Sequence, residues 1–343
     1  MPNNLIQINP LVSPQWDKAV LNSSYPQFFH RSNWLKTITD TYKFKPLCLM
    51  VESEPGCTIP LLIARTLPGK KKAIALPFSD SCDIYCSNIE PVELVSKIIQ
   101  VIRNENINKL EFRGTNHFQP SGEPSHSYWE HRLHLTKEDA LWKNLSPSKK
   151  RNIRKAQKNE IIITFNNEKN ALQIYYNLHC LTRKRHGLPP QPVSFFNAIY
   201  ENIIAKNCGE VTLVYSGNTP VAGAVFLFSG SEAIYKFGAS DNNFQPMRIN
   251  DLLMWEAIRR YTEKGYSSLS FGKTEKFHEG LCHYKEGFGA LRKNLSDHYY
   301  VVKTGEKVKK TSKAYYGAIN HLLRKMPISV LRKFGEVLYQ YAV

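Results

Sequence analysis

The sequence has no apolar run long enough to cross a membrane. Among its 343 residues 42% are hydrophobic, but polar residues interrupt every stretch before the roughly 18 that a spanning helix needs. The first segment, MPNNLIQINPLVSP, also lacks the basic start and apolar core of a secretory signal. We therefore expect a cytoplasmic protein that reaches the inner face of the membrane, if at all, as a peripheral protein.

Cysteine is present without the pattern of a metal site or of a disulfide framework. The seven cysteines are an odd number and include no C-x-x-C pair. Cys82 and Cys86 lie close together, but no second pair follows at the spacing of a zinc site. The sequence therefore predicts no bound metal and no disulfide framework.

Acidic residues are scarce beside the basic ones. The chain has 46 Lys and Arg against 29 Asp and Glu, a formal net charge of +17. Such an excess favours an anionic partner: nucleic acid, an acidic membrane surface or a phosphate-bearing small molecule. It indicates what the protein associates with and does not indicate its fold.

Internal repeats and low-complexity segments are also absent, which excludes solenoids and long linkers. A chain of 343 residues exceeds an ordinary single core, so its length favours two domains. We place the domains at residues 1–140 and 141–304. A tail over 305–343 follows them.

The first half has the pattern of a sheet with one helix. Short apolar runs between Gly and Pro turns predict strands over 46–52, 58–65 and 72–78. Apolar residues at helical spacing predict a helix over 91–106, and the run KLEFRG after it predicts another strand. These elements indicate a sheet flanked by a helix.

The second half repeats this logic. A helix is predicted to begin after Ser146, a capping residue followed by proline. The runs over 209–217 and 220–230 predict a hairpin, and a helix is predicted from Asn250 or Asp251, either of which can cap it. The whole pattern indicates an α+β (mixed α/β) fold with two units, each a mostly antiparallel sheet flanked by helices.

Five segments, in their order and spacing, resemble the Fem family of aminoacyltransferases in the GNAT-like superfamily: LPFSD (76–80), LSPSKKRNIRKAQK (145–158), INDLLMWEAI (249–258), LSFGKT (269–274) and HEGLCHYKEGFGA (278–290). The resemblance implies two tandem GNAT-like domains. It also implies an enzyme that moves an acyl or aminoacyl group onto an amino group of a cell-envelope precursor, either a peptidoglycan stem peptide or a polysaccharide or lipid-linked sugar.

The segment HYKEGFGA carries the catalytic prediction. Fem-like enzymes have an aromatic residue and a lysine just before a Phe-Gly pair, and Tyr284 and Lys285 match them. The resemblance implies that Lys285 stabilises the negative charge that develops on the carbonyl oxygen, or binds a donor phosphate. The alternative is a solvated lysine on a helix over 277–287.

Six further residues are predicted to bind substrate. Arginine suits bidentate recognition of phosphate, and the resemblance gives Arg183 and Arg185 this role toward the acceptor. It also implies that Trp34 and Lys36 contact the acceptor from the first domain, and that Tyr235 lines the cleft of the second. The full set is Trp34, Lys36, Arg183, Arg185, Tyr235 and Arg248.

His283 and Glu256 are second-rank candidates for a general base. The identity of the donor stays open. An acetyl-CoA-binding GNAT has a glycine-rich turn that delivers main-chain N–H groups to a pyrophosphate at a helix start, whereas this sequence has QPMRINDLL there. The resemblance leaves aminoacyl-tRNA and acyl-CoA as possible donors and implies no tightly bound cofactor and no metal.

The basic tail is predicted as two amphipathic helices divided by Pro327, which either dock on the domains or lie on an anionic membrane. The partners implied are a nucleotide- or lipid-linked envelope precursor and, for one donor, tRNA, with the chain as a monomer. A different class of function also fits the charge: a non-enzymatic RNA- or membrane-binding module that uses the basic helix KKRNIRKAQK.

Overall fold

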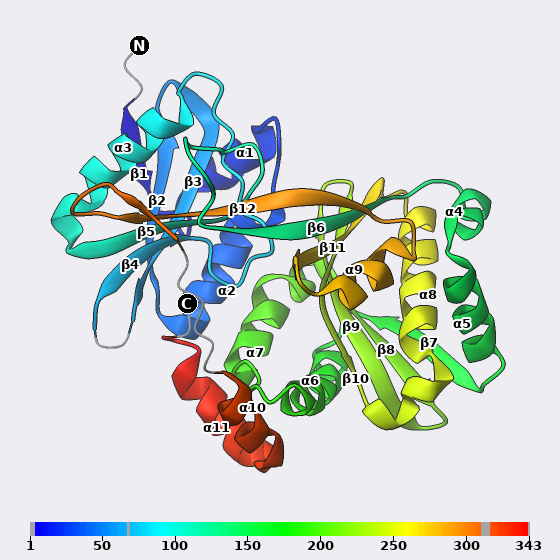
Figure 1. Ribbon diagram of the computed structural model, residues 1–343. Coiled ribbons are helices and arrows are strands. Elements are labelled where there is room, and N and C mark those ends of the chain that lie inside the picture. Colours follow the sequence, from blue (N-terminus) through cyan, green and yellow to red (C-terminus); the bar gives the residue numbers. More distant parts are fainter. Residues whose placement is uncertain (1–3, 67–68, 310–315, 342–343) are drawn as a thin grey trace. The chain divides into compact units, whose positions relative to one another are not determined.

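The computed structural model describes residues 4–66, 69–309 and 316–341 and divides into two compact units (Figure 1). The first unit comprises Met1–Tyr128, Asn294–Ser312 and Val337–Val343, and the second comprises Trp129–Lys293 and Lys313–Glu336. The boundaries predicted from the sequence, at residues 140 and 304, would make each domain one uninterrupted segment of the chain. The chain instead returns to the first unit within a strand that pairs there, β12 (Leu291–Val301).

The first unit is a sheet with strand order β1-β2-β3-β4-β5-β12. Its strands pair antiparallel except for β4 and β5, which are parallel. The parallel pair is joined through α3, whose buried face of Leu94, Ile98 and Ile102 covers the sheet. The elements are β1 (Leu5–Ile8), α1 (Pro14–Asn22), η1 (Phe28–His30), α2 (Ser32–Tyr42), β2 (Lys45–Val51), β3 (Glu54–Arg65), β4 (Lys71–Ala75), α3 (Pro91–Ile102), η2 (Arg103–Glu105), β5 (Ile107–Thr115) and, after β12, β13 (Lys307–Val308).

The second unit is a sheet with strand order β6-β11-β10-β9-β8-β7. Strands β7 to β10 form an antiparallel meander, and β10 pairs with β11 in parallel. The elements are β6 (His126–His134), α4 (Glu138–Asn144), α5 (Pro147–Gln157), β7 (Ile161–Asn166), α6 (Lys169–Arg185), α7 (Val193–Asn202), η3 (Ile204–Lys206), β8 (Gly209–Ser216), β9 (Thr219–Ser229), β10 (Glu232–Ser240), η4 (Asn242–Met247), α8 (Ile249–Glu263), β11 (Ser268–Glu275) and α9 (Glu279–Glu286).

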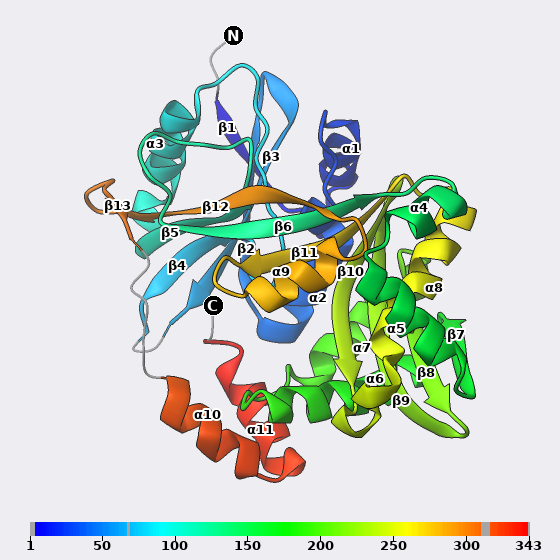
Figure 2. The ribbon, with the colours of Figure 1, turned by 45° about the vertical axis from the view of Figure 1, so that its right-hand side comes forward.

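Helices cover both faces of the second sheet. On β9 the Cβ position of Gly223 faces Tyr175 of α6, while the ring of Phe226 packs 5.0 Å from that of Tyr261 on α8. Residues an odd number apart on a strand point to opposite faces, so α6 and α8 lie on opposite sides of β9. Helix α5 lies beside α8 in both views (Figures 1 and 2).

The tail forms two helices, α10 (Tyr316–Lys325) and α11 (Ile328–Leu338), that lie side by side (Figure 2), as the position of Pro327 predicts. Helix α11 docks on α6: the guanidinium of Arg332 lies 5.1 Å from the Tyr176 ring and donates to Asn177 Oδ1 at 2.8 Å. Residues 310–315 of the predicted tail lie outside the described residues. No helix among those described is long and apolar enough to span a membrane.

One pair of cysteines is bonded. Cys57 on β3 forms a disulfide with Cys86, and their Cα atoms are 5.0 Å apart. The sequence offered no sign of this pair, because the two residues are 29 positions apart and the fold alone brings them together. The other five cysteines lie outside this disulfide. Within residues 4–66, 69–309 and 316–341, no three His, Cys, Asp or Glu side chains gather as a metal site.

Candidate active site

The parallel strands β10 and β11 separate shortly after they meet. They pair only over residues 232–234 and 268–270, although β10 continues to Ser240 and β11 to Glu275. Strands that part in this way leave main-chain N–H and C=O groups on their facing edges without ladder partners. The opening can therefore receive an extended ligand that forms main-chain hydrogen bonds.

A β-bulge lies where the opening begins. In the pairing with β9, Tyr235 faces Phe226 and Phe237 faces Val225, so Lys236 is the extra residue on β10. A bulge bends its strand and redirects the neighbouring side chains. The extra residue lies two positions beyond Ile234, the last residue of β10 paired with β11, so the bend falls where the two strands separate.

Tyr235 lies on β10 at this opening, and its place in a substrate cleft stays a prediction. Its ring centroid is 5.5 Å from that of Phe226 and 6.4 Å from that of Phe271 on β11. The hydroxyl group lies over Gly238, where an added Cβ would overlap it. Burial raises the pKa of Tyr235 to about 12, so the phenol stays protonated at neutral pH.

Lys285 is buried, which differs from the alternative of a solvated lysine. Only 4% of the residue is exposed, and its Nζ donates to the carbonyl oxygens of Gly272 at 3.0 Å and Lys273 at 3.5 Å. Both carbonyls belong to β11 just beyond Ser270, the last residue paired with β10. The main chain thus holds the ammonium group of Lys285 beside the part of β11 that has left β10.

The neighbouring Tyr284 packs on a buried ion pair. The ammonium group of Lys149 lies 3.5 Å from the centre of the Tyr284 ring and 4.4 Å from that of Phe288. Lys149 Nζ is bonded to Asp251, whose second oxygen accepts from Asn152 Nδ2 at 2.8 Å. Burial lowers the pKa of Lys149, although the Asp251 carboxylate opposes this. Burial also raises the pKa of Tyr284.

The start of α8 differs from the prediction. Arg248, in the left-handed conformation at φ 59°, is the N-cap, rather than Asn250 or Asp251. Those two side chains are used elsewhere: Asp251 binds Lys149, and Asn250 Nδ2 donates to Ser240 Oγ at 3.2 Å. The reason is that η4 runs directly into α8, so the helix begins before the residues that could cap it.

Arg185 reaches the same region as Tyr284. Its Nη1 donates to the carbonyl oxygen of Ser240 at 3.2 Å, and Ser240 is linked through Asn250 to the Tyr284 hydroxyl, which donates to the Asn250 carbonyl at 3.2 Å. Arg183 instead donates to Pro189 in the loop after α6. The end of β10 and the start of α8 therefore link Arg185 to Tyr284 through Ser240 and Asn250.

The two predicted residues of the first unit differ in their surroundings. Trp34 is fully buried, and its indole N–H donates to Ser79 Oγ at 2.9 Å, which favours a packing role. Lys36 is exposed and pairs with Asp40 at 2.8 Å.

The two second-rank candidates differ in exposure, since His283 is exposed and Glu256 is half-buried. His283 is exposed, and its Nδ1 lies 2.9 Å from the Glu279 carbonyl oxygen. Glu256 forms an ion pair with Arg259 at 3.0 Å. Neither contact links these residues to Tyr235, Tyr284 or Lys285.

Sequence reasoning missed the role of Lys149, which it placed on an exposed basic face. Lys149, Ile153 and Ala156 are the buried residues of α5, and their spacing puts them on one side of the helix. This helical spacing with Ile153 and Ala156 was the sequence feature that could have predicted a buried Lys149. The first contact of this helix was predicted correctly, because Ser146 Oγ accepts from the Lys149 N–H at 3.3 Å as its N-cap.

One domain-family model and several solved structures match this chain. Residues 147–286 match the family model of an acetyltransferase (GNAT) domain. FemX has the same fold over 87% of this chain and 97% of its own, with a TM-score of 0.66 and 14% identity. No curated protein matches the sequence significantly.

Two other solved structures share the fold. A conserved protein of unknown function from Bacteroides thetaiotaomicron covers 86% of this chain and 98% of its own, with a TM-score of 0.59 and 11% identity. The C-terminal domain of a putative lysylphosphatidylglycerol synthetase from Agrobacterium fabrum covers 90% and 94%, with a TM-score of 0.54 and 10% identity. Residues 147–286 therefore match a GNAT domain, and the chain as a whole has the fold of FemX.

Proposed function

We propose that the second unit transfers an acyl or aminoacyl group from an activated donor to an amino group of a cell-envelope precursor. One observation carries this proposal: β10 and β11 part at the bulge of Lys236, with Tyr235 on one strand and the Lys285 ammonium held on the other. The opening offers main-chain hydrogen bonds, and the lysine offers a positive charge in a site shielded from water.

The chemistry follows from this arrangement. The donor carbonyl lies between the strands, and the amine attacks its carbon to form a C–N bond. The carbonyl oxygen becomes negative, and main-chain N–H groups and the Lys285 ammonium stabilise it. The C–S or C–O bond to the leaving group then breaks, and the thiol or ribose hydroxyl that departs takes up the proton lost by the amine. Alignment of donor and acceptor supplies much of the rate.

Both donors that the sequence leaves open fit this scheme. Acyl-CoA presents a thioester and aminoacyl-tRNA an ester, and each has an activated carbonyl. In the first turn of α8 the side chains of Arg248 and Asp251 stand where a glycine-rich turn would deliver bare main-chain N–H groups. The Arg248 guanidinium is the group there that suits a donor phosphate.

The acceptor is proposed to be a nucleotide- or lipid-linked precursor. Arg185 at the end of β10, with Arg183 and Lys36, supplies cations for its phosphates. The names of FemX and of the putative lysylphosphatidylglycerol synthetase domain support an envelope substrate. The basic helices α10 and α11 leave Ile319, Leu322 and Phe334 exposed, which supports peripheral contact of a monomer with an anionic membrane.

The test compares wild type with Lys285→Ala. Each is incubated with labelled aminoacyl-tRNA or labelled acyl-CoA and a mixture of nucleotide- and lipid-linked precursors, and labelled product is measured. Loss of the lysine should lower the rate by about 10²–10³, while circular dichroism shows the fold retained. The donor that labels product is the substrate.

His283→Ala is the matched control, because His283 lies on the same helix and is exposed. It should transfer at the wild-type rate. Equal transfer by Lys285→Ala and wild type would exclude the lysine from the reaction. Failure of the wild type with both donors, with RNA binding unaffected by the substitution, would favour a non-enzymatic module.

A further inference from the structure

Each of the two tail helices carries an exposed apolar stripe. On α10, Ile319 and Leu322 are 56% and 58% exposed. On α11, Val330 and Phe334 are 39% and 45% exposed. Residues three or four apart lie on the same side of a helix, so each pair forms a continuous stripe. Large apolar side chains gathered in this way on a surface indicate an interaction site.

Cations accompany the apolar stripes. Arg324, Lys325 and Lys333 are exposed, and Glu336 is the only acidic residue over positions 316–338. An anionic bilayer complements this surface, because its headgroups attract the cations and its interior accepts the apolar side chains. Nucleic acid would match the charge but has no apolar interior for the stripes to enter. A second copy of the chain would bring like charges together.

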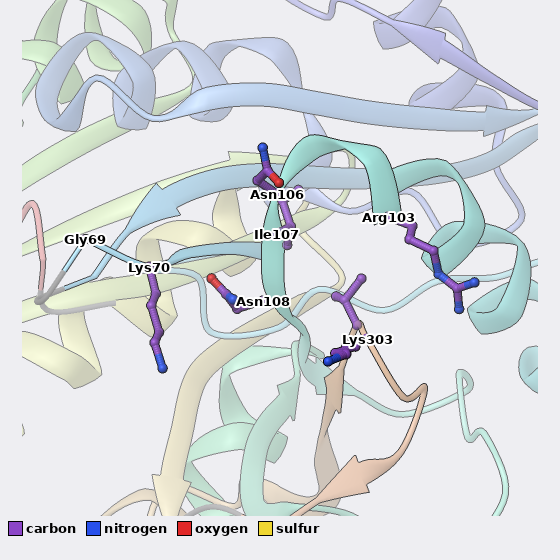
Figure 3. Close-up of a pocket in the computed structure, with 8 residues that line it drawn as sticks. Gly69, Lys70, Arg103, Asn106, Ile107, Asn108 and Lys303 are labelled. Atoms are coloured by element: carbon purple, nitrogen blue, oxygen red, sulfur yellow. The ribbon is translucent and has the colours of Figure 1, made fainter.

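Cations elsewhere in the chain are dispersed. In the first unit, Lys70, Arg103 and Lys303 line an open hollow of about 600 Å³. Lys70 and Arg103 point away from each other (Figure 3), so the three cations do not converge on one small anion. Dispersed positive charge attracts an extended negative surface. The formal net charge of +17 therefore favours the same partner as the tail does.

A different side of each tail helix packs against the loop between α6 and α7. A Cβ atom added at Gly335 of α11 would overlap the carbonyl oxygen of Pro190. One added at Gly187 would overlap the carbonyl oxygen of Asn320 on α10. The main chains of the tail helices and of the loop therefore touch, and the two glycines permit this approach.

The same loop holds the end of α6. The Leu188 N–H donates to the Arg183 carbonyl oxygen at 3.0 Å, and Arg183 Nε donates to the Pro189 carbonyl oxygen at 3.2 Å. Two residues further along, Arg185 donates to the carbonyl oxygen of Ser240, the last residue of β10. Contacts therefore run without interruption from the tail helices to the arginines of α6 and on to β10.

We propose that α10 and α11 lie on an anionic membrane and that this contact fixes the loop that positions Arg183 and Arg185. The apolar stripes enter the interface, while Arg324, Lys325 and Lys333 contact the lipid headgroups. Because tail and loop touch through their main chains, anchoring the tail also restricts the loop. The membrane surface rests on the tail alone, whereas any role of the two arginines toward an acceptor rests on the proposed function.

Vesicle sedimentation tests the surface without any transfer reaction. The full chain is mixed with phosphatidylcholine vesicles, with vesicles that also contain phosphatidylglycerol, and with RNA. The wild type should bind the anionic vesicles more tightly than the neutral ones. Leu322→Gln/Phe334→Gln should bind the anionic vesicles about tenfold or more weakly, because two apolar side chains no longer leave water. Both positions are exposed, so circular dichroism should show the fold retained.

Leu21→Gln/Ile162→Gln is the matched control, since these side chains are 51% and 59% exposed and lie outside the tail. It should bind the anionic vesicles as the wild type does. Equal binding by the two double variants, or no binding of the wild type to anionic vesicles, would overturn the proposal. RNA binding that is lost in Leu322→Gln/Phe334→Gln while vesicle binding is kept would also overturn it and assign the surface to nucleic acid.

Hydrogen–deuterium exchange tests the link to α6. The main-chain amides of residues 183–191 should exchange more slowly when the wild type is bound to anionic vesicles than in solution. Gly335→Ala, which displaces α11 from Pro190, should lose this slowing, whereas Gly280→Ala, with nothing within 4 Å of its added Cβ, should keep it. Unchanged exchange in vesicle-bound wild type would overturn the link. Neither measurement needs transfer, so the proposed function stands or fails separately with Lys285→Ala.

Discussion

The ammonium group of Lys149 lies 3.5 Å from the centre of the Tyr284 ring. Because the same group is bonded to Asp251, one side chain of α5 contacts both α9 and the first turn of α8. Gly287 leaves room for the Lys149 side chain, because a Cβ atom added at Gly287 would lie 2.9 Å from Lys149 Cε. The buried pair therefore positions the helix that carries Lys285.

Loss of one partner of this pair should be costly. Lys149→Met or Asp251→Leu leaves a buried charge without its counter-ion, which typically costs about 3–5 kcal/mol. The double variant Lys149→Met/Asp251→Leu should recover most of that loss, because no charge remains buried. Urea denaturation measures each free energy of unfolding. Lys155→Met, at an exposed position of the same helix, is the control, and equal stability of all four variants would contradict the prediction.

Gly238 should not accept a side chain. An added Cβ would overlap the Tyr235 hydroxyl and lie 2.7 Å from Cζ of that ring, so Gly238→Ala must displace Tyr235 from the opening. We expect a loss of about 1–3 kcal/mol from overpacking and slower transfer. Gly280→Ala is the matched substitution, since nothing lies within 4 Å of its added Cβ. Thermal melting and the transfer assay compare the two, and identical behaviour would refute the role given to Tyr235.

Acid should destabilise the protein through buried histidines. Burial lowers the pKa of His30, His179 and His298 from 6.5 to about 4. Between these values the unfolded chain binds protons that the folded chain does not, so their contribution is complete above pH 6.5 and is lost as pH falls toward 4.

His298→Leu should flatten that dependence. The slope of unfolding free energy against pH, measured from pH 7 to pH 4, should be smaller than in the wild type. Burial raises the pKa of Glu232 to about 7, which has the opposite effect on the slope, but Glu232 is present in both proteins and cancels in the comparison. An unchanged slope would show that His298 is not buried in its neutral form.

Counting the cysteines that react with an alkylating agent tests the disulfide directly. Alkylation in denaturant without reductant should modify the five cysteines outside the disulfide, and alkylation after reduction should modify all seven. A peptide that joins Cys57 to Cys86 should appear only in the unreduced digest. Reduction should also lower the melting temperature, since closing a loop of 29 residues stabilises a fold by about 3–4 kcal/mol. Seven modified cysteines before reduction would contradict the bond.

The order of helices and strands could be predicted from local sequence. The spacing of apolar residues after Pro91 predicted α3, and the pair Ser146 and Pro147 predicted the start of α5. Pro327 divided α10 from α11. Each of these features depends on neighbours within a few residues, where side-chain periodicity and capping chemistry act.

The start of α8 shows where local rules stopped being sufficient. Asn250 and Asp251 are good capping residues, yet both side chains bind partners from other elements, Ser240 and Lys149. Lys149 looked like one more cation on an exposed helix, because its carboxylate partner is 102 residues away in the sequence. Such contacts depend on long-range packing, which no short window contains.

The sequence by itself determined the α+β class, the GNAT resemblance and the pair Tyr284 and Lys285 as candidates, since these depend on periodicity and on motifs read in order. Only the tertiary structure decided that β10 and β11 part after three residue pairs, that Lys285 is buried against β11 and that three distant cations line one hollow. The physical reason is that strand pairing, burial and electrostatic potential arise between segments far apart in the chain, where local sequence imposes no constraint.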